Sequence, residues 1–134
     1  MGEKTHCIFL VDDNPVNLKI GRNVLQEKYA VLTIPSGDKL LFALKKTKPN
    51  LILLDVEMPD MSGYDIIKIL QADPETAGIP VIFLTGKTDP ENERVGRTLG
   101  AVDFVSKPFS PPVLLEKIDL HLSANHLPVD HSEM

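Results

Sequence analysis

The sequence has little of what marks secreted, disulfide-stabilised or membrane-spanning proteins. It contains one cysteine and no tryptophan, and no apolar run approaches the roughly 20 residues that cross a bilayer. A single cysteine cannot form an internal disulfide, and Cys7 lies in an apolar run, so we expect a buried thiol in a reducing compartment. Residues 2–6 are too polar to begin a secretory signal. These absences predict a cytoplasmic location and no membrane partner.

Positive charge is also scarce. Lysine and arginine together number 14 against 19 aspartates and glutamates, which gives a net charge of -5, and the basic residues form no stripe. Because binding to a phosphate backbone depends mainly on clustered positive charge, this balance predicts no direct contact with nucleic acid. The length of 134 residues and the hydrophobic fraction of 43% suit one globular domain.

What the sequence does contain is a regular alternation of short apolar runs and helical patterns. The apolar runs predict five strands, at residues 7–11, 30–34, 51–54, 81–84 and 102–105. The helical patterns predict helices after Asn14, at about 38–46, 63–72 and 90–99, and from Ser110 to about residue 122. Strands that alternate with helices indicate a parallel sheet covered on both faces. The run at 30–34 ends without a reactive side chain, so we expect it at an edge of the sheet.

The spacing of apolar residues predicts which side of each helix is buried. Residues that recur every four positions lie on one face of a helix and are expected to pack on the sheet. In the first helix these residues are Val16, Ile20 and Val24, supplemented by Leu25, and in the second they are Leu40, Leu41 and Leu44.

The helix expected at 90–99 is different from the others. Only Val95 and Leu99 are clearly apolar, and Gly96 in its interior costs about 1 kcal/mol relative to alanine. A helix that is held weakly beside a chemical site is a candidate moving part.

Four of the predicted strands end at, or lead directly to, a reactive polar side chain. The residues are Asp12, Asp13, Asp55, Thr85 and Lys107. Because the carboxyl ends of parallel strands meet at one edge of a sheet, we expect these side chains to share one crevice. Clustered carboxylates suit a hard cation such as Mg²⁺, and an ammonium and a hydroxyl suit a phosphoryl group. The sequence therefore predicts a site for a divalent cation and a phosphoryl group.

Each of these residues also has a simpler explanation by itself. The adjacent aspartates can cap a helix, Asp55 can end a strand, the threonine is a β-branched strand residue and the lysine can be solvated. Those explanations do not account for the whole set together. The histidines invite a different metal site, but His121, His126 and His131 are five residues apart and share no helical face, so we expect surface residues.

Four segments surround the polar strand ends: LVDDN at 10–14, LDVEMPDMSG at 54–63, FLTG at 83–86 and GAVDFVSKPF at 100–109. Together they resemble the receiver (REC, CheY-like) domain of bacterial two-component response regulators. The resemblance implies a flavodoxin-like, doubly wound α/β fold with five parallel strands in the order 2-1-3-4-5 and helices on both faces. It also implies a receiver domain at residues 5–123, followed at 124–134 by a flexible tail or the start of a linker.

The resemblance implies chemical roles for the acidic residues. Asp55 would accept a phosphoryl group from a sensor histidine kinase or a phosphotransfer protein. Asp13, Asp55 and the backbone carbonyl of Glu57 would bind Mg²⁺ or Mn²⁺, and Asp12 would act through a bound water.

It further implies how the site would signal. Thr85 and Lys107 would contact the phosphoryl oxygens, and Thr85 would move so that the ring of Phe104 swings inward. The face made by the fourth helix, the fifth strand and the fifth helix would then act on an output domain or downstream protein, and the family often forms homodimers through that face. The resemblance also implies a cis bond between Lys107 and Pro108.

Two variable positions are candidates for tuning the lifetime of the phosphoryl group. Glu57 lies two residues after Asp55, and Lys87 lies two residues after Thr85. We expect the two side chains to approach each other across the site and limit attack by water.

Two other classes of function are weaker matches. Phosphatases of the haloacid dehalogenase type also use an aspartate nucleophile, Mg²⁺, a hydroxyl residue and a lysine, but they place a second aspartate where this chain has Glu57. An interaction module that is never phosphorylated would not need the complete acidic set. We therefore expect a signalling switch rather than an enzyme. Residues 110–115 followed by Leu122 resemble receivers placed before cyclic-di-GMP enzymes of the HD-GYP and GGDEF kinds, which suggests one type of output domain.

Overall fold

The structure is a computed structural model that describes residues 6–86 and 89–126. Its centre is a parallel sheet of five strands in the order β2-β1-β3-β4-β5. The strands are β1 (Cys7–Val11), β2 (Ala30–Ile34), β3 (Leu51–Asp55), β4 (Val81–Thr85) and β5 (Asp103–Ser106). This arrangement confirms the predicted fold class, the strand order and the edge position of residues 30–34.

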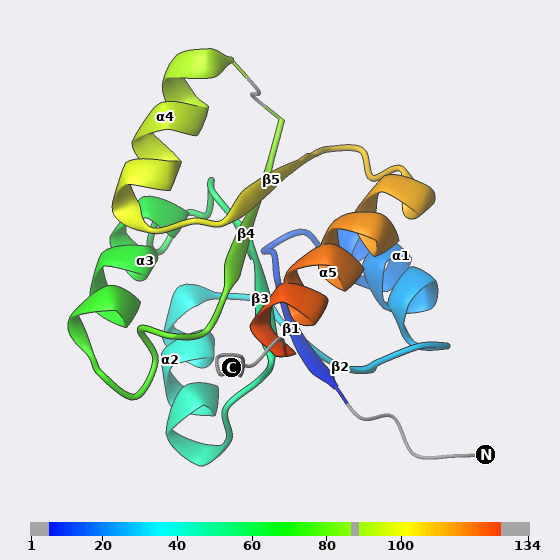
Figure 1. Cartoon of the computed structure of the whole chain (residues 1–134), viewed down its shortest axis with the longest axis horizontal. Coiled ribbons are helices and arrows are strands. Elements are labelled where there is room, and N and C mark those ends of the chain that lie inside the picture. The colour runs from blue at the N-terminus through cyan, green and yellow to red at the C-terminus, as the bar shows by residue number, and fades with distance from the viewer. Residues whose placement is uncertain (1–5, 87–88, 127–134) are drawn as a thin grey trace, which may run out of the picture.

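Helices cover both faces of the sheet. They are α1 (Pro15–Leu25), α2 (Gly37–Lys46), α3 (Gly63–Ala72), α4 (Pro90–Leu99) and α5 (Pro111–His126). Figure 1 shows α1 and α5 on one face and α2, α3 and α4 on the other. Helix α5 runs past its predicted end at about residue 122 into the segment expected to be a tail, and residues 127–134 lie outside the described part of the chain. None of the helices in the two described ranges is long and apolar enough to cross a membrane.

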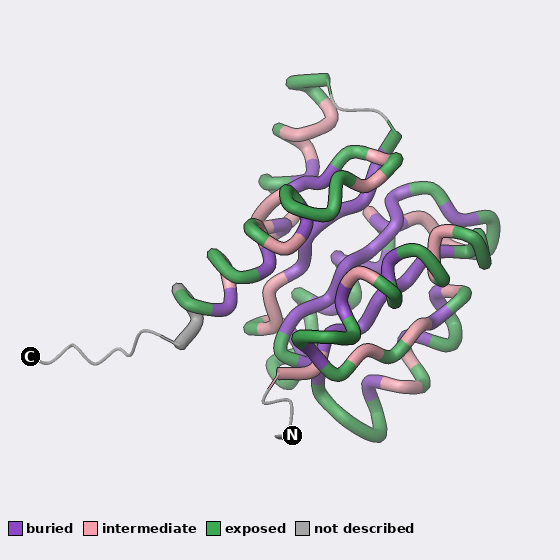
Figure 2. Tube along the Cα trace, turned by 90° about the vertical axis from the view of Figure 1, so that its right-hand side faces the viewer, coloured by how far each residue is buried: buried purple, intermediate pink, exposed green. Residues whose placement is uncertain are grey.

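Two separate hydrophobic cores lie on the two faces of the sheet, because successive residues of a strand point to opposite sides. In β3, Ile52 and Leu54 belong to the core under α2, α3 and α4, whereas Leu51 and Leu53 belong to the core under α1 and α5. Figure 2 shows the buried strands in the middle of the molecule and exposed residues along the outer sides of the helices. Asp55, the next residue of β3, is therefore held by a strand that is buried on both sides.

Side-chain caps define where the helices next to the strand ends begin. The side chain of Asn14 accepts a hydrogen bond of 2.8 Å from the backbone N–H of Val16, and the Ser62 hydroxyl accepts one of 3.1 Å from Asp65. Such caps satisfy N–H groups that have no partner within the helix. They fix the direction of the chain just after the polar ends of β1 and β3.

The predicted buried face of α1 is wrong at its first two residues, although Leu25 is buried as expected. Val16 is 61% exposed and Ile20 is 45% exposed, and Val24 is only partly buried. The helix instead approaches the sheet through Gly21, where an added Cβ would lie 2.6 Å from a methyl carbon of Leu10. Because glycine has no side chain, this close contact leaves no mark in the hydrophobic pattern.

Smaller differences concern α2 and the cysteine, whereas α4 follows the prediction. Leu41 in α2 is partly buried rather than buried, and Cys7 is half-buried because it is the first residue of β1, at the rim of the core. Partial burial raises the pKa of the Cys7 thiol. Helix α4 buries only Gly96, while Val95 and Leu99 are half-buried, which agrees with the expectation that few apolar side chains hold this helix.

Candidate phosphoryl and metal site

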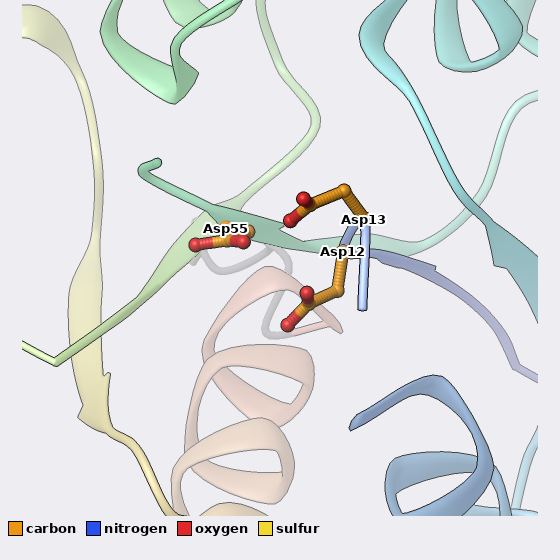
Figure 3. A group of neighbouring side chains, drawn as sticks. All are labelled: Asp12, Asp13 and Asp55. Carbon is orange, nitrogen blue, oxygen red and sulfur yellow. The ribbon is translucent and has the colours of Figure 1, made fainter. Parts of the chain in front are cut away.

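Three carboxylates meet at the carboxyl ends of the two central strands. Asp12 and Asp13 follow β1 directly and Asp55 is the last residue of β3. One oxygen from each of the three lies within 4.8 Å of the others. Figure 3 shows the three carboxylates turned toward the same space. The structure thus brings together the acidic residues that the sequence analysis singled out.

Asp12 is fully buried and has structural contacts of its own. Its carboxylate accepts hydrogen bonds from the backbone N–H of Asn14 at 2.9 Å and from the side-chain amide of Asn17 at 3.2 Å. It therefore also holds the start of α1, which was the simpler explanation for this residue. Asp13, by contrast, is exposed and open to solvent.

Asp55 is also buried, but only one of its carboxylate oxygens has a hydrogen-bond partner among the described residues. Its side chain is 1% exposed. One oxygen, Oδ1, accepts a hydrogen bond of 3.1 Å from the backbone N–H of Glu57. The other, Oδ2, is buried and has no hydrogen-bond partner among the described residues. A buried carboxylate oxygen without a partner is costly, so it marks a position suited to a cation or a reacting group.

Lys107 supplies the positive charge opposite the carboxylates. Its Nζ atom lies 3.1 Å from Oδ1 of Asp55 and 3.4 Å from Oδ2 of Asp12. Its backbone N–H donates to the carbonyl of Thr85 at 2.9 Å, which ties the chain after β5 to the end of β4. The bond between Lys107 and Pro108 is cis, the isomer that the resemblance predicted.

The electrostatics of the site reflect burial of more negative than positive charge. Burial is the main reason that the pKa of the Asp55 carboxyl is raised to about 6, and the negative charge of Asp12 raises it further. The hydrogen bond from the Glu57 N–H and the positive charge of Lys107 act in the opposite direction and lower this pKa. Burial by itself lowers the pKa of Lys107, but the hydrogen bond to Asp55 and the charges of both buried aspartates outweigh this effect and raise it. Such an arrangement favours an additional cation.

Thr85 lies beside this group of charges. It is the last residue of β4 and is buried, and it lines a pocket of about 280 Å³ together with Val56, Glu57, Tyr64 and other residues. Thr85 thus belongs to the wall of a cavity next to the loop that follows Asp55. Of the two residues expected to tune the lifetime of the phosphoryl group, Glu57 is exposed and Lys87 lies outside the described residues.

Phe104 points into the core rather than toward solvent. It is 5% exposed, its ring centre lies 5.7 Å from that of Phe83, and the guanidinium carbon of Arg97 lies 5.4 Å from its ring centre. The resemblance implies a ring that moves inward when the site is phosphorylated. In this structure the ring is already buried.

A polar cluster near Phe104 was not found from the sequence. Asp103 binds Nζ of Lys117 at 2.9 Å and Nε2 of His121 at 2.9 Å, and Arg97 lies 3.6 Å away. Lys117 also donates to the carbonyl of Phe104 at 2.8 Å. Burial raises the pKa of Asp103, but the hydrogen bonds from His121, Lys117 and the Phe104 N–H outweigh it and hold the pKa below its ordinary value.

This cluster corrects the expectation that His121 is a surface residue, because its side chain is half-buried against Asp103. The spacing of four residues between Lys117 and His121 was the signal that could have indicated a shared helical face. The side chain of His126 and the whole of His131 lie outside what the structure describes.

Comparison with known proteins identifies the class that this fold and site define. A family model described as "Response regulator receiver domain" matches residues 8–119, and the chain belongs to that family. It is 43% identical over 91% of its length to a probable cyclic di-GMP phosphodiesterase of Vibrio cholerae, and 36% identical over 88% to the DNA-binding response regulator MtrA of Mycolicibacterium smegmatis. The chain spans only 28% of the first relative and 51% of the second.

Solved structures agree with the sequence relatives. The signal receiver domain of a histidine kinase from Syntrophus aciditrophicus is 32% identical, with a TM-score of 0.82 and 96% of each chain covered. The chemotaxis response regulator CheY4 of Vibrio cholerae is 29% identical, with a TM-score of 0.81 and with 86% of this chain and 97% of that chain covered. The chain is therefore a receiver domain of the CheY-like fold.

Proposed function

We propose that Asp55 accepts a phosphoryl group from a phosphohistidine on a sensor histidine kinase or a phosphotransfer protein. The observation that carries this proposal is the environment of Asp55, a buried carboxylate with one unpartnered oxygen among the described residues and an ammonium 3.1 Å from the other. In this proposal the domain is a cytoplasmic signalling switch that catalyses only its own phosphorylation and dephosphorylation. Membership of the receiver family supports the same reading.

The residues fit the divalent cation that such a reaction uses. Three carboxylates gather within 4.8 Å, and they include the unpartnered Oδ2 of Asp55. In the proposal Asp13, Asp55 and the backbone carbonyl of Glu57 hold Mg²⁺ or Mn²⁺, and Asp12 acts through a bound water. When bound, the cation supplies positive charge that offsets the charge of the phosphoryl oxygens.

The remaining chemistry is positioning and charge compensation. A carboxylate oxygen of Asp55 forms a bond to phosphorus, the bond between phosphorus and the imidazole nitrogen of the donor breaks, and the imidazole keeps the electron pair. Lys107, which already lies within reach of Asp55, donates to a phosphoryl oxygen. The hydroxyl of Thr85 donates to another.

For the signalling step we propose that Thr85 and Phe104 act together on α4. Because Phe104 is already buried, its contribution is a change in its contact with α4 rather than a swing from solvent. Helix α4 buries only Gly96, so it can shift at low cost. The face made by α4, β5 and α5 would then reach an output domain or a downstream protein, or pair with a second copy of the domain.

The same reasoning extends to the lifetime of the phosphoryl group and to the output. We propose that Glu57 and Lys87 limit attack by water on the phosphoryl group. If Glu57→Ala and Lys87→Ala both leave the dephosphorylation rate unchanged, this role is wrong. For the output we propose a cyclic-di-GMP enzyme, since the 43% identical relative is a probable cyclic di-GMP phosphodiesterase. A reading frame that continues past Met134 into a DNA-binding region would overturn that assignment.

The test of the main proposal is phosphorylation by a small donor. We expect the protein to gain the mass of one phosphoryl group when it is incubated with acetyl phosphate and Mg²⁺. Asp55→Asn keeps the size of the side chain but removes the nucleophile, and we expect it to gain nothing. Asp38→Asn, an aspartate on α2 that is not part of the acidic group, is the matched control and should behave like the unaltered protein. Modification that persists in Asp55→Asn, or no modification at all, would contradict the proposal.

A further inference from the structure

The loop that follows β3 is tied to α2 by one side chain. Asp60 lies in this loop, and its Oδ2 atom accepts hydrogen bonds from the backbone N–H groups of Gly37 at 3.1 Å and Asp38 at 3.3 Å. Gly37 and Asp38 are the first two residues of α2. The first N–H groups of a helix have no partner within the helix, and a carboxylate stabilises them by hydrogen bonding and by its charge. Asp60 therefore caps the start of α2, although it lies 23 residues after Gly37 in the chain.

Close packing accompanies these hydrogen bonds. Gly37 is buried, and an added Cβ there would lie 3.0 Å from Cδ1 of Ile66, 3.2 Å from Cβ of Met61 and 3.4 Å from Oδ2 of Asp60. The first turn of α2 thus rests directly on the loop and on α3. The contact is tight, since even a methyl group at position 37 would require Ile66 and Met61 to shift by a few tenths of an ångström.

The other end of the same loop belongs to the phosphoryl site. The Glu57 N–H donates to Oδ1 of Asp55 at 3.1 Å, and the Gly63 N–H closes the loop by donating to the carbonyl of Val56 at 2.8 Å. Within residues 58–61, all of which the structure describes, the hydrogen bonds to a helix or strand are those that the Asp60 carboxylate accepts from the start of α2. Core packing of Met58 and Met61 also holds this stretch, but its polar tie to another element is the Asp60 contact.

We infer that Asp60 is a positioning residue for the phosphoryl site. Its bonds to the first turn of α2 fix the loop in which the backbone carbonyl of Glu57 would face the cation. This inference rests on the proposed function, because that function assigns the Glu57 carbonyl to Mg²⁺. Asp60 is not one of the residues that the proposed function assigns to the cation or to the phosphoryl group.

The test compares two ways of weakening the same end of α2. Asp60→Ala removes the tie between the loop and the helix. Ser36→Ala removes the other cap of that helix, whose hydroxyl accepts a hydrogen bond of 3.2 Å from the Lys39 N–H, and leaves the loop contact intact. Because loss of an outer support typically weakens metal binding by about tenfold or more, we expect Asp60→Ala to bind Mg²⁺ about tenfold more weakly. Ser36→Ala should lower stability only. Binding can be followed by amide chemical shifts of Asp13 and Glu57.

A second readout needs no cation. Hydrogen exchange of the Glu57 amide, measured without Mg²⁺, should become faster in Asp60→Ala and stay unchanged in Ser36→Ala. Asp60→Asn keeps one acceptor oxygen and should show a smaller effect in both measurements, which keeps the test valid if the alanine variant folds poorly.

Two outcomes would overturn the inference. One is Mg²⁺ affinity in Asp60→Ala equal to that of the unaltered protein, and the other is exchange at Glu57 that does not respond to Asp60. If the unaltered protein itself fails to bind Mg²⁺, the proposed function fails, and the exchange measurement still decides whether Asp60 holds the loop.

Discussion

Phe104 packs so closely on Gly96 that a methyl group at position 96 would lie 2.5 Å from the Cζ atom of its ring. The same methyl group would lie 3.1 Å from a ring carbon of Phe83. Glycine is unfavourable within a helix, so its presence in α4 is explained by this contact. The buried aromatic pair and the weakly anchored helix are thus in direct contact.

We predict that Gly96→Ala destabilises the fold although alanine is the better helix former. The gain in helix propensity is about 1 kcal/mol, but forcing a methyl group into the aromatic contact costs about 1–3 kcal/mol. The net loss should appear in urea unfolding. Gly78→Ala, where an added Cβ meets nothing within 4 Å, is the control and should be neutral or slightly stabilising. Equal stability of the two variants would show that the rings of Phe104 and Phe83 give way to the added methyl group at little cost.

A second glycine prediction concerns the phosphoryl site. At Gly63 an added Cβ would lie 2.7 Å from the backbone carbonyl oxygen of Asp55 and 2.9 Å from Cα of Val56. Backbone atoms cannot give way as a side chain can, so Gly63→Ala should cost about 2 kcal/mol or more and slow phosphorylation by acetyl phosphate. The same Gly78→Ala control applies. A variant that is stable and phosphorylated at the usual rate would mean that the loop is far more adaptable than its packing indicates.

The Asp103 cluster predicts a pH dependence of stability. The pKa of Asp103 is lower in the folded protein than the ordinary value, so its charged form stabilises the fold above about pH 4. That stabilisation is lost as the pH falls through the folded pKa. Asp103 faces Arg97 from α4 and Lys117 and His121 from α5, and a charged hydrogen-bonded group of this kind is worth about 1.5–3 kcal/mol.

Asp103→Asn should therefore lower the free energy of unfolding most near neutral pH. The difference from the unaltered protein should shrink below about pH 4, and urea unfolding across this range measures it. Asp119→Asn, which removes an exposed partner of Lys28, should show little effect at any pH. A difference that stays constant with pH would mean that the charge of Asp103 is not what stabilises the cluster.

Removal of the cation provides another test of the acidic group. A ligand that binds only the folded state at about ten times its Kd raises the free energy of unfolding by about 1.4 kcal/mol, and we expect Mg²⁺ to do so here. Asp13→Asn should abolish this gain while leaving stability without Mg²⁺ nearly unchanged, because Asp13 is exposed. Chemical unfolding with and without a chelator measures both quantities. A Mg²⁺ effect that survives in Asp13→Asn would place the cation elsewhere.

Much of this arrangement could be predicted from the sequence because it depends on local patterns. Apolar runs that end at Asp12, Asp55 and Thr85 indicate strands and also the edge at which those residues meet. The resemblance supplied the strand order, which no single run contains. Together they predicted the acidic group within 4.8 Å that the structure shows.

The rest could not be predicted because it depends on contacts between distant residues. Val16 and Ile20 share a face of α1, but spacing does not say which face meets the sheet, and the true contact is made by Gly21. The tie between Asp60 and the start of α2 joins residues that are neighbours only after β3 has paired with β1. The half-buried place of His121 likewise depends on how α5 lies against β5.

The alternation of the two cores along β3 has a consequence for how this domain can change over evolution. Each residue of the strand faces the opposite side from its neighbours, so inserting or deleting one residue would exchange the two interiors and turn the phosphoacceptor away from its partners. Substitutions that preserve bulk leave that alignment untouched. The central strand should therefore vary in composition among descendants of this protein while its length stays constant.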